Sequence, residues 1–251
     1  MIYITGDCHG KWSRFSIEAF PEQKEMTRDD FVIVCGDFGL WKNDKTEKWW
    51  FQWLSEKPFT LLFVDGNHEN FDRLYSDEFD IVDFHGGKAH KIRENIYHLM
   101  RGYIFDLCDK KFFAFGGARS YDIKDGILRE EDYPSKKALI DDYNRRTERG
   151  ELLRINHVSW WKQELPTEEE MSFGLSNLEN NGNKVDYIVS HCCPQQIASL
   201  CGFFSSDKLT SYFDSIYEKI EFSRWFFGHY HDDKQILTKF IMLYEQIVRI
   251  V

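Results

Sequence analysis

The sequence of 251 residues predicts an α/β fold, and two observations support this. Apolar runs of strand length recur along the chain, and they are apolar throughout rather than at alternate positions, which is typical of strands buried on both faces. Stretches with helical spacing of apolar residues lie between them. The predicted strands are Ile2 to Thr5, Phe31 to Cys35, Leu61 to Asp65, Val185 to Val189 and Trp225 to Phe227.

Three helices are predicted between these strands. The stretch from Asp44 to Lys57 is rich in tryptophan and ends before Pro58, which cannot continue a helix. The stretch from Thr167 to Glu179 begins with a capping box, in which Thr167 and a glutamate three residues later satisfy early backbone amides. The third helix is indicated by apolar residues at helical spacing, namely Leu209, Tyr212, Phe213, Ile216, Tyr217 and Ile220.

The remaining segments differ in character. Residues 81 to 115 contain short apolar runs separated by turn residues, which predicts hairpins and a mixed sheet. Residues 235 to 251 are interpreted as two further strands. The chain shows no repeat and no linker, so a single domain over residues 1–251 is predicted. A densely charged stretch at about 119–182 is interpreted as a cap or insertion.

The composition limits the classes of partner. A formal net charge of −10 argues against a general affinity for nucleic acid or for an anionic membrane. The first polar motif follows Met1 so closely that no secretory signal is expected, and no apolar run approaches the roughly 20 residues of a membrane span. The six cysteines show no CxxC spacing, so reduced thiols and a cytoplasmic location are expected.

Each predicted strand is followed by a short polar motif. Open α/β sheets bind their ligands at the carboxyl ends of their strands, so these motifs are expected to converge. Their carboxylates, carboxamide and imidazoles form a mixed oxygen and nitrogen set that suits Mn, Fe, Zn or Ni better than Ca or Mg. The motifs are Gly6-Asp7-Cys8-His9, Gly36-Asp37, Gly66-Asn67-His68-Glu69, Ser190-His191 and Gly228-His229-Tyr230-His231.

The ordered set resembles the calcineurin-like metallophosphoesterase superfamily, whose pattern is D-x-H, G-D, G-N-H-[DE], H and G-H-x-H. A second resemblance, to a bacterial and phage subgroup, is carried by the stretch from Gly116 to Asp122, by Trp160-Trp161 and by Glu164. The superfamily resemblance implies a four-layer αββα sandwich built on two mixed β-sheets.

The resemblance also implies a dinuclear metal centre, with Mn as the first expectation for both ions and Fe, Zn or Ni as alternatives. Two divalent ions about 3.5–4 Å apart would share a bridging hydroxide for in-line attack on a phosphomonoester or phosphodiester. His68 is implied as the catalytic group near the leaving group, either a general acid or a transition-state donor. One ion would be held by Asp7, His9, Asp37 and His231, and the other by Asp37, Asn67, His191 and His229.

The chain departs from the superfamily pattern in one informative place. The phosphoprotein phosphatases carry a phosphate-binding arginine in their second block, whereas this chain continues as Phe38-Gly39-Leu40-Trp41. The favoured substrate is therefore a small soluble ester or a nucleotide. A nuclease acting on single-stranded nucleic acid and a non-catalytic protein-binding scaffold remain the alternatives. The sequence identifies no protein partner.

Several other residues are candidates for supporting roles. Arg119 is a candidate for substrate binding, with a salt bridge to Asp122 or another acid as the alternative. Glu69 is interpreted as capping or bracing a helix that begins near Asn70. The paired cysteines Cys192 and Cys193 are interpreted as packing residues rather than metal ligands. Trp160 and Trp161 are interpreted as core or cap residues, with base stacking as the alternative.

Overall fold

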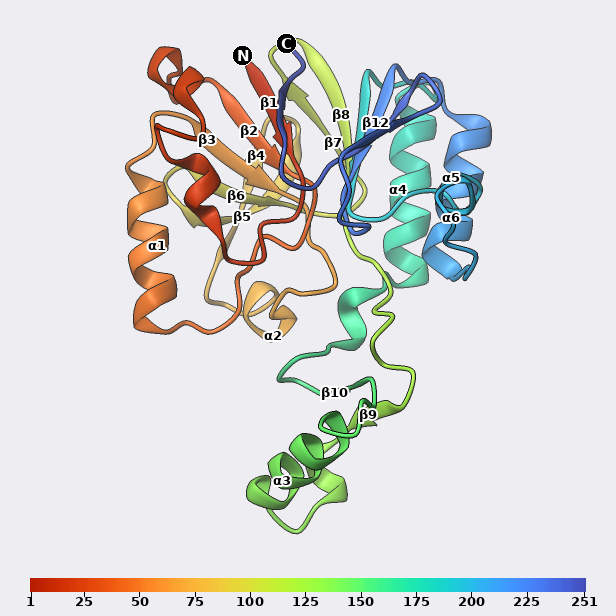
Figure 1. The fold of residues 1–251 in the computed structure, drawn as a ribbon. Coiled ribbons are helices and arrows are strands. Elements are labelled where there is room, and N and C mark those ends of the chain that lie inside the picture. Colours follow the sequence, from red (N-terminus) through yellow and green to blue (C-terminus); the bar gives the residue numbers. More distant parts are fainter.

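The computed structural model describes residues 1–251 and contains two large mixed sheets (Figure 1). The first sheet has seven strands in the order β15-β1-β2-β3-β6-β5-β4, and the second has six in the order β13-β14-β12-β11-β8-β7. The first contains β1 (Ile2–Thr5), β2 (Phe31–Val34), β3 (Thr60–Phe63), β4 (Asp80–Phe84), β5 (Gly87–Arg93), β6 (Ile96–Leu99) and β15 (Ile247–Arg249). The second contains β7 (Tyr103–Leu107), β8 (Lys110–Phe115), β11 (Tyr187–Ser190), β12 (Arg224–Phe227), β13 (Lys234–Ile236) and β14 (Phe240–Met242).

The strands that precede the polar motifs are paired in parallel in the central part of each sheet. In the first sheet β1, β2 and β3 pair in parallel, and in the second β11 and β12 do so. Antiparallel strands complete the edges, for example β4 beside β5 and β13 beside β14. The predicted mixed sheets are therefore confirmed, and the carboxyl ends of the parallel strands bring the motif loops together.

The side chains of each central strand alternate between two cores, and this alternation defines the layers. In β1, Ile2 and Ile4 belong to the apolar cluster between the two sheets, while Tyr3 belongs to the cluster on the outer face of the first sheet. In β12, Phe226 lies in the central cluster while Trp225 and Phe227 face the helices outside the second sheet. Strands buried on both faces carry continuous apolar runs, as the sequence predicted.

Helices cover the outer face of each sheet and complete the four-layer sandwich (Figure 1). The helix α1 (Lys45–Ser55) packs Phe51 and Leu54 against the first sheet. The helices α4 (Glu168–Asn180), α5 (Gln195–Leu200) and α6 (Lys208–Lys219) cover the second sheet. The predicted capping box of Thr167 is present at the start of α4. None of the helices is both long enough and apolar enough to cross a membrane.

The predicted C-terminal pair of strands is wrong in number, because residues 235–251 contribute to three short strands. The chain reverses between β13 and β14 at Leu237, which adopts a left-handed backbone conformation with φ 54°. The stretch between β14 and β15 is held by the carboxylate of Asp233, which accepts hydrogen bonds from the amides of Tyr244, Glu245 and Gln246.

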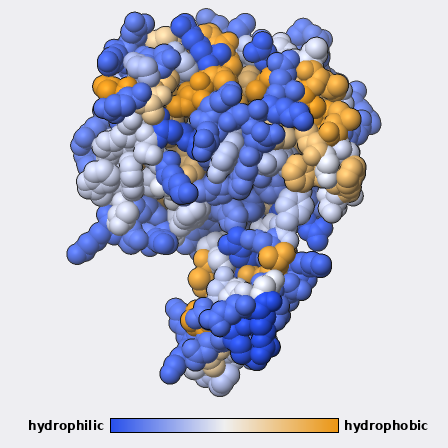
Figure 2. Space-filling model, viewed as in Figure 1, coloured by the Kyte–Doolittle hydropathy of each residue, from blue (hydrophilic) through white to orange (hydrophobic).

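A small arm projects from the body (Figure 1). It contains β9 (Gly126–Leu128), α3 (Lys136–Thr147) and the parallel strand β10 (Leu153–Ile155). Its surface is mostly hydrophilic on the face seen in Figure 2. The arm has an apolar cluster of its own, separate from the three larger ones, formed by Leu128, Leu139, Leu153 and Ile155.

The projecting segment is shorter than the predicted cap. The predicted boundary at residue 182 includes α4, which packs Met171 and Leu178 into the core of the second sheet. The high charge density of residues 119–182 predicted a cap that extends to residue 182. The charged residues of α4, however, lie on the exposed face of a helix that belongs to the body. The assignment of residues 1–251 to a single domain stays a prediction.

The small size of the arm cluster generates a first prediction. Replacing the buried Leu139 by alanine should open the arm without unfolding the body, because such core truncations cost about 2–5 kcal/mol and the arm has few other apolar contacts. Hydrogen exchange should accelerate over residues 126–155 and stay slow in β1, β2 and β3. Ile140→Ala, at the half-exposed neighbouring position, is the matched control. Equal loss of protection throughout both sheets would contradict an independent arm core.

Candidate metal centre

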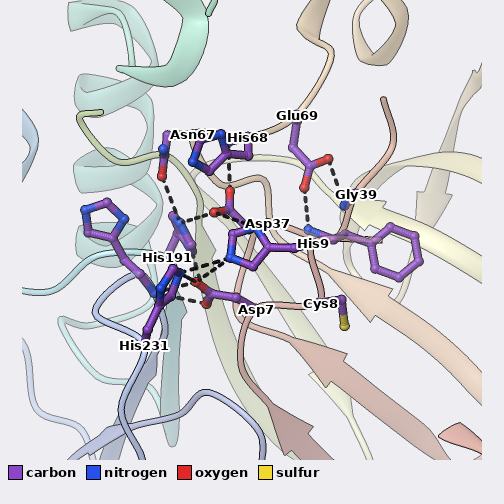
Figure 3. A network of polar contacts seen from close by, with 12 residues as sticks. Asp7, Cys8, His9, Asp37, Gly39, Asn67, His68, Glu69, His191 and His231 are labelled. Atoms are coloured by element: carbon purple, nitrogen blue, oxygen red, sulfur yellow. Dashed lines mark hydrogen bonds and ion pairs between the residues drawn. The ribbon is translucent and has the colours of Figure 1, made fainter. Parts of the chain in front are cut away.

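The motif loops converge at one end of the two sheets, and Figure 3 shows their side chains directed toward a shared point. Asp37 lies at the centre of the group. Its Oδ1 accepts a hydrogen bond of 2.8 Å from the backbone amide of His68. Its Oδ2 lies 3.7 Å from Nδ1 of His9 and 3.4 Å from Nε2 of His191. The oxygen that faces both histidines is therefore Oδ2, whereas Oδ1 serves to orient the carboxylate.

Asp7 is completely buried and faces three of the predicted histidines. Its Oδ2 lies 3.2 Å from Nε2 of His231 and 3.6 Å from Nε2 of His9. Its Oδ1 lies 3.9 Å from Nδ1 of His191. The Nε2 atoms of His9 and His231 are 3.0 Å apart, so the two rings point at one position beside Asp7.

His191 is oriented by a backbone carbonyl. Its Nδ1 is 2.7 Å from the carbonyl oxygen of Cys35, which can only accept, so Nδ1 carries a proton and Nε2 faces the centre. Burial alone would lower the pKa of His191, but the carboxylates of Asp37 and Asp7 outweigh burial and raise it to about 10. The protein thus holds a positive charge between these carboxylates, as expected of a position built for a cation.

Asn67 and His229 lie on the side of His191. The carboxamide oxygen of Asn67 is 3.1 Å from Nε2 of His191. The backbone amide of His229 donates to Asp7, while its ring nitrogens make no hydrogen bond or ion pair. The rings of His229 and His191 have centroids 5.0 Å apart. Burial lowers the pKa of His229, so its imidazole is neutral and has a lone pair available for a ligand.

The ring of His68 lies beside the candidate metal ligands but makes no hydrogen bond to them. Its ring centroid is 5.6 Å from that of His9, and its ring nitrogens make no hydrogen bond. Its backbone is held on both sides, because its amide donates to Asp37 and its carbonyl oxygen accepts from Nε1 of Trp41. Burial lowers the pKa of His68, so the ring is neutral at pH 7 and its Nε2 or Nδ1 can donate a proton in a hydrogen bond.

The backbone is strained at several of the candidate ligands. Left-handed φ angles are rare outside glycine, although His and Asp adopt them more often than most residues. They occur at His9 (48°), Asp37 (46°), His229 (68°) and His231 (52°). Such conformations cost roughly 1–3 kcal/mol each and persist where the surroundings enforce them, often at functional sites. No local sequence pattern predicts left-handed backbone at these four residues.

The glycines of the motifs leave room for neighbouring carboxylates. A Cβ added to Gly66 would lie 2.0 Å from Oδ1 of Asp37, and one added to Gly228 would lie 2.0 Å from Oδ1 of Asp7. Contacts this short are impossible for real atoms. Glycine is required at both positions because carboxylates from other loops fill the space of a side chain.

Glu69 does not cap a helix, in contrast to the sequence interpretation. Asn70 caps the short helix α2 (Phe71–Leu74) with its own side chain. The buried carboxylate of Glu69 instead accepts from the amides of Phe38, Gly39 and Leu40, at 2.6, 3.3 and 3.0 Å. Burial and the charge of Asp37 raise the pKa of Glu69 to about 8. Glu69 therefore braces the loop that carries Asp37.

Arg119 is exposed and makes no hydrogen bond or ion pair. The alternative salt bridge with Asp122 does not form, because Asp122 pairs with Arg154 of β10, whose Nε lies 2.8 Å from Oδ2 of Asp122. The sequence did not single out Arg154. The charges of Arg154 and Asp122 both act on the pKa of His68, which places this ion pair beside the site.

The remaining sequence interpretations concern packing. Cys192 and Cys193 are buried in the core cluster beneath the helices, and burial raises the pKa of both thiols, which agrees with packing residues. Trp161 is buried and donates from Nε1 to Asp72 at 2.7 Å, and Trp160 is half-buried beside it. The sequence did not identify Ser120, which accepts a hydrogen bond from Asn67, although its place after the Gly116-Gly117 turn was a usable signal.

The donor set suits a pair of divalent ions. Ligand atoms of Asp7, His9 and His231 lie within 4.8 Å of one another, and so do those of Asp7, Asp37 and His191. The two groups share Asp7, and Asp37 faces both. Two buried carboxylates held this close together need positive charge between them, and mixed oxygen and nitrogen donors suit Mn, Fe, Zn or Ni.

The glycine packing generates a second prediction. Gly66→Ala should displace the carboxylate of Asp37 and abolish binding of at least one ion, because the new methyl would overlap Oδ1. Metal per chain, measured by mass spectrometry after dialysis against Mn²⁺, should fall while the circular dichroism spectrum is preserved. Gly150→Ala is the control for backbone strain without a clash, since Gly150 has a left-handed φ of 83° but its added Cβ would meet no atom within 4 Å. An unchanged metal content in Gly66→Ala would refute the packing argument.

Comparisons with known proteins give one informative result. The search of curated proteins gave no match. A solved structure described as phosphopantetheinyl hydrolase (PptH) from Mycobacterium tuberculosis is similar at 15% identity, over 97% of this chain and 89% of that one, with a TM-score of 0.40. A likeness this weak carries no argument. The model of the family described as calcineurin-like phosphoesterase matches residues 1–233, a range that contains all five motifs, and the chain therefore belongs to this family.

Proposed function

We propose that this calcineurin-like phosphoesterase uses two divalent ions to hydrolyse a small soluble phosphomonoester or phosphodiester, with Mn²⁺ as the first candidate metal. The observation that supports this best is the position of Asp37 Oδ2, which faces His9 on one side and His191 on the other. A carboxylate oxygen placed between two sets of donors is what a bridging ligand requires. This arrangement supports the ligand sets that the family resemblance implies.

The two proposed sites divide the donors by position. Asp7, His9, Asp37 and His231 would hold one ion, and Asp37, Asn67, His191 and His229 the other. When bound, the ions supply Lewis acidity, which makes water nucleophilic at neutral pH and offsets charge on the phosphoryl oxygens. The protein holds the donors in place through the Cys35 carbonyl on His191 and the His68 and His229 amides on the two aspartates.

His68 is the proposed catalytic residue. Its half-buried, neutral ring stands next to His9 without a hydrogen-bonding partner, so it is free to donate to the leaving-group oxygen of a substrate. Because the pKa of His68 is lowered, its ring is neutral before the substrate binds. This favours a role as a neutral hydrogen-bond donor to the transition state over a role as a charged general acid. Arg119 is proposed to bind a substrate phosphate, since it is exposed and has no partner within the chain.

A cavity beside His9 supports a small substrate with a flat substituent. It has a volume of about 250 Å³ and is lined by Trp12, Trp41, Trp50 and Lys42, among others. Indole rings stack on planar groups, and the position of the cavity next to a proposed metal ligand suits an aryl ester or a nucleotide. The cavity is open to solvent, and its residues come from the segment after β1, the loop after β2 and α1.

The charge of the arm disfavours the nuclease alternative. Residues 120–163 contain nine basic and nine acidic side chains, and some of these pair within the arm, for example Arg145 with Asp142 and Arg146 with Glu151. The chain as a whole carries a net charge of −10. Neither the arm nor the whole chain therefore offers an extended basic track for a phosphate backbone. The scaffold alternative is disfavoured because each proposed ligand position carries a residue able to bind metal.

The role of His68 generates a third prediction. His68→Ala should keep two ions per chain yet lower kcat for an aryl phosphate ester about 10²-fold or more, as expected for loss of a positioned proton donor. Turnover with Mn²⁺ supplied and metal content should be measured on the same samples. The exposed His85, in the turn between β4 and β5, offers the control His85→Ala. A rate equal to that of the native protein would remove His68 from the mechanism.

The tryptophan-lined cavity generates a fourth prediction. Trp50→Ala should raise KM for phenyl phosphate or a nucleotide about tenfold, since stacking on an aromatic ring contributes roughly 1–3 kcal/mol. KM for methyl phosphate, which has nothing to stack, should stay unchanged. Trp49→Ala is the control, because Trp49 is the adjacent residue, is 58% exposed and lies outside the cavity. Equal effects on phenyl and methyl phosphate would assign Trp50 to packing alone.

A further inference from the structure

The base of the arm is hydrogen-bonded to a proposed metal ligand. The side-chain nitrogen of Asn67 lies 3.2 Å from Oγ of Ser120, at the point where the chain leaves the body. Oγ of Ser120 lies 2.6 Å from Oε2 of Glu164, where the chain returns from the arm. The backbone amide of Ser120 also donates to Oε1 of Glu164, at 3.1 Å. All three residues are buried, and Glu164 is only 1% exposed.

The hydrogen bonds that link Asn67, Ser120 and Glu164 have a fixed donor-to-acceptor direction. The amide nitrogen of Asn67 can only donate, so Ser120 Oγ accepts from it. The hydroxyl proton of Ser120 is then directed to Glu164, whose two carboxylate oxygens accept from the hydroxyl and from the backbone amide. A carboxylate at position 164 therefore determines which way the Ser120 hydroxyl points, and Ser120 determines which end of the Asn67 carboxamide faces it.

These hydrogen bonds also determine where the side-chain oxygen of Asn67 points. With its nitrogen held by Ser120, its oxygen must face Nε2 of His191, at 3.1 Å. If the carboxamide of Asn67 were rotated by 180°, its NH2 group would face His191 in place of its oxygen and could not bind a cation there. We propose that Ser120 and Glu164 are positioning residues that orient the Asn67 carboxamide and thereby set the affinity for one of the two ions. This proposal rests on the proposed two-metal function.

Anchoring of the arm does not account for these contacts. No lysine, arginine or histidine forms an ion pair with Glu164. Burial, which is costly for a carboxylate, raises its pKa to about 7, and the hydrogen bonds from Ser120 oppose this shift. The arm is already tied to the body elsewhere, because Asp72 of α2 accepts from Trp161 at 2.7 Å and from His157 at 2.9 Å. The hydrogen bonds that offset this cost lead from Glu164 through Ser120 to a proposed metal ligand, Asn67.

The two ends of the arm meet at this pair. Ser120 and Glu164 are 44 residues apart in sequence, and the whole of β9, α3 and β10 lies between them. The orientation of Asn67 therefore depends on closure of the base of the arm. Outer-shell hydrogen bonds of this kind typically contribute 10–100-fold to metal affinity.

The test is calorimetric titration of Mn²⁺ into the metal-free full-length protein and its variants. In Ser120→Ala, affinity for one ion should fall about 10–100-fold while affinity for the other stays within about threefold of native. Glu164→Gln is nearly isosteric but offers one acceptor for the two donors of Ser120, so it should weaken the same ion. Ser120→Thr keeps the hydroxyl and should bind more tightly than Ser120→Ala at that site.

Asp72→Asn is the control for anchoring, since it weakens the other tie of the arm without touching Asn67. Native affinity for both ions in Ser120→Ala would overturn the proposal. So would equal weakening of both ions in Ser120→Ala and Asp72→Asn, because that pattern indicates loosening of the arm. Failure of the proposed function shows itself differently, as a native protein that binds no pair of ions or hydrolyses no ester.

Discussion

The burial of two carboxylates beside one imidazole is the constraint on which the rest of this structure depends. Asp7 and Asp37 are both removed from solvent, and both lie within 4 Å of His191. Like charges in a medium of low dielectric repel strongly, so they can be held together only with positive charge between them. In the protein alone the proton on His191 supplies it, and two divalent ions are the proposed occupants.

The sandwich serves this arrangement by directing loops from both sheets to one place. Parallel strands β1, β2 and β3 deliver Asp7, Asp37 and Asn67 from the first sheet, and β11 and β12 deliver the histidines from the second. The apolar cluster between the sheets fixes their separation, since it is built from fully buried side chains such as Ile33, Leu62 and Phe226. Glycines at the motif positions let the loops approach closely enough for the carboxylates to share one centre.

Much of the fold could be predicted from sequence because its signals are local. Continuous apolar runs marked β1, β2, β3, β11 and β12, and the capping box of Thr167 marked α4. The family pattern identified the residues that converge. The extent of the arm was overestimated because charge density does not distinguish a projecting segment from a surface helix such as α4. The left-handed backbone at His9 and Asp37, the brace supplied by Glu69 and the Asn67–Ser120–Glu164 contacts depend on residues distant in sequence, and no local pattern encodes them.

The most direct measurement is anomalous diffraction from crystals of the protein grown with Mn²⁺. The arrangement around Asp37 predicts two anomalous peaks about 3.5–4 Å apart, one on the His9 side of Oδ2 and one on the His191 side. A single peak, or two peaks that do not share Asp37, would contradict the account of a bridging carboxylate.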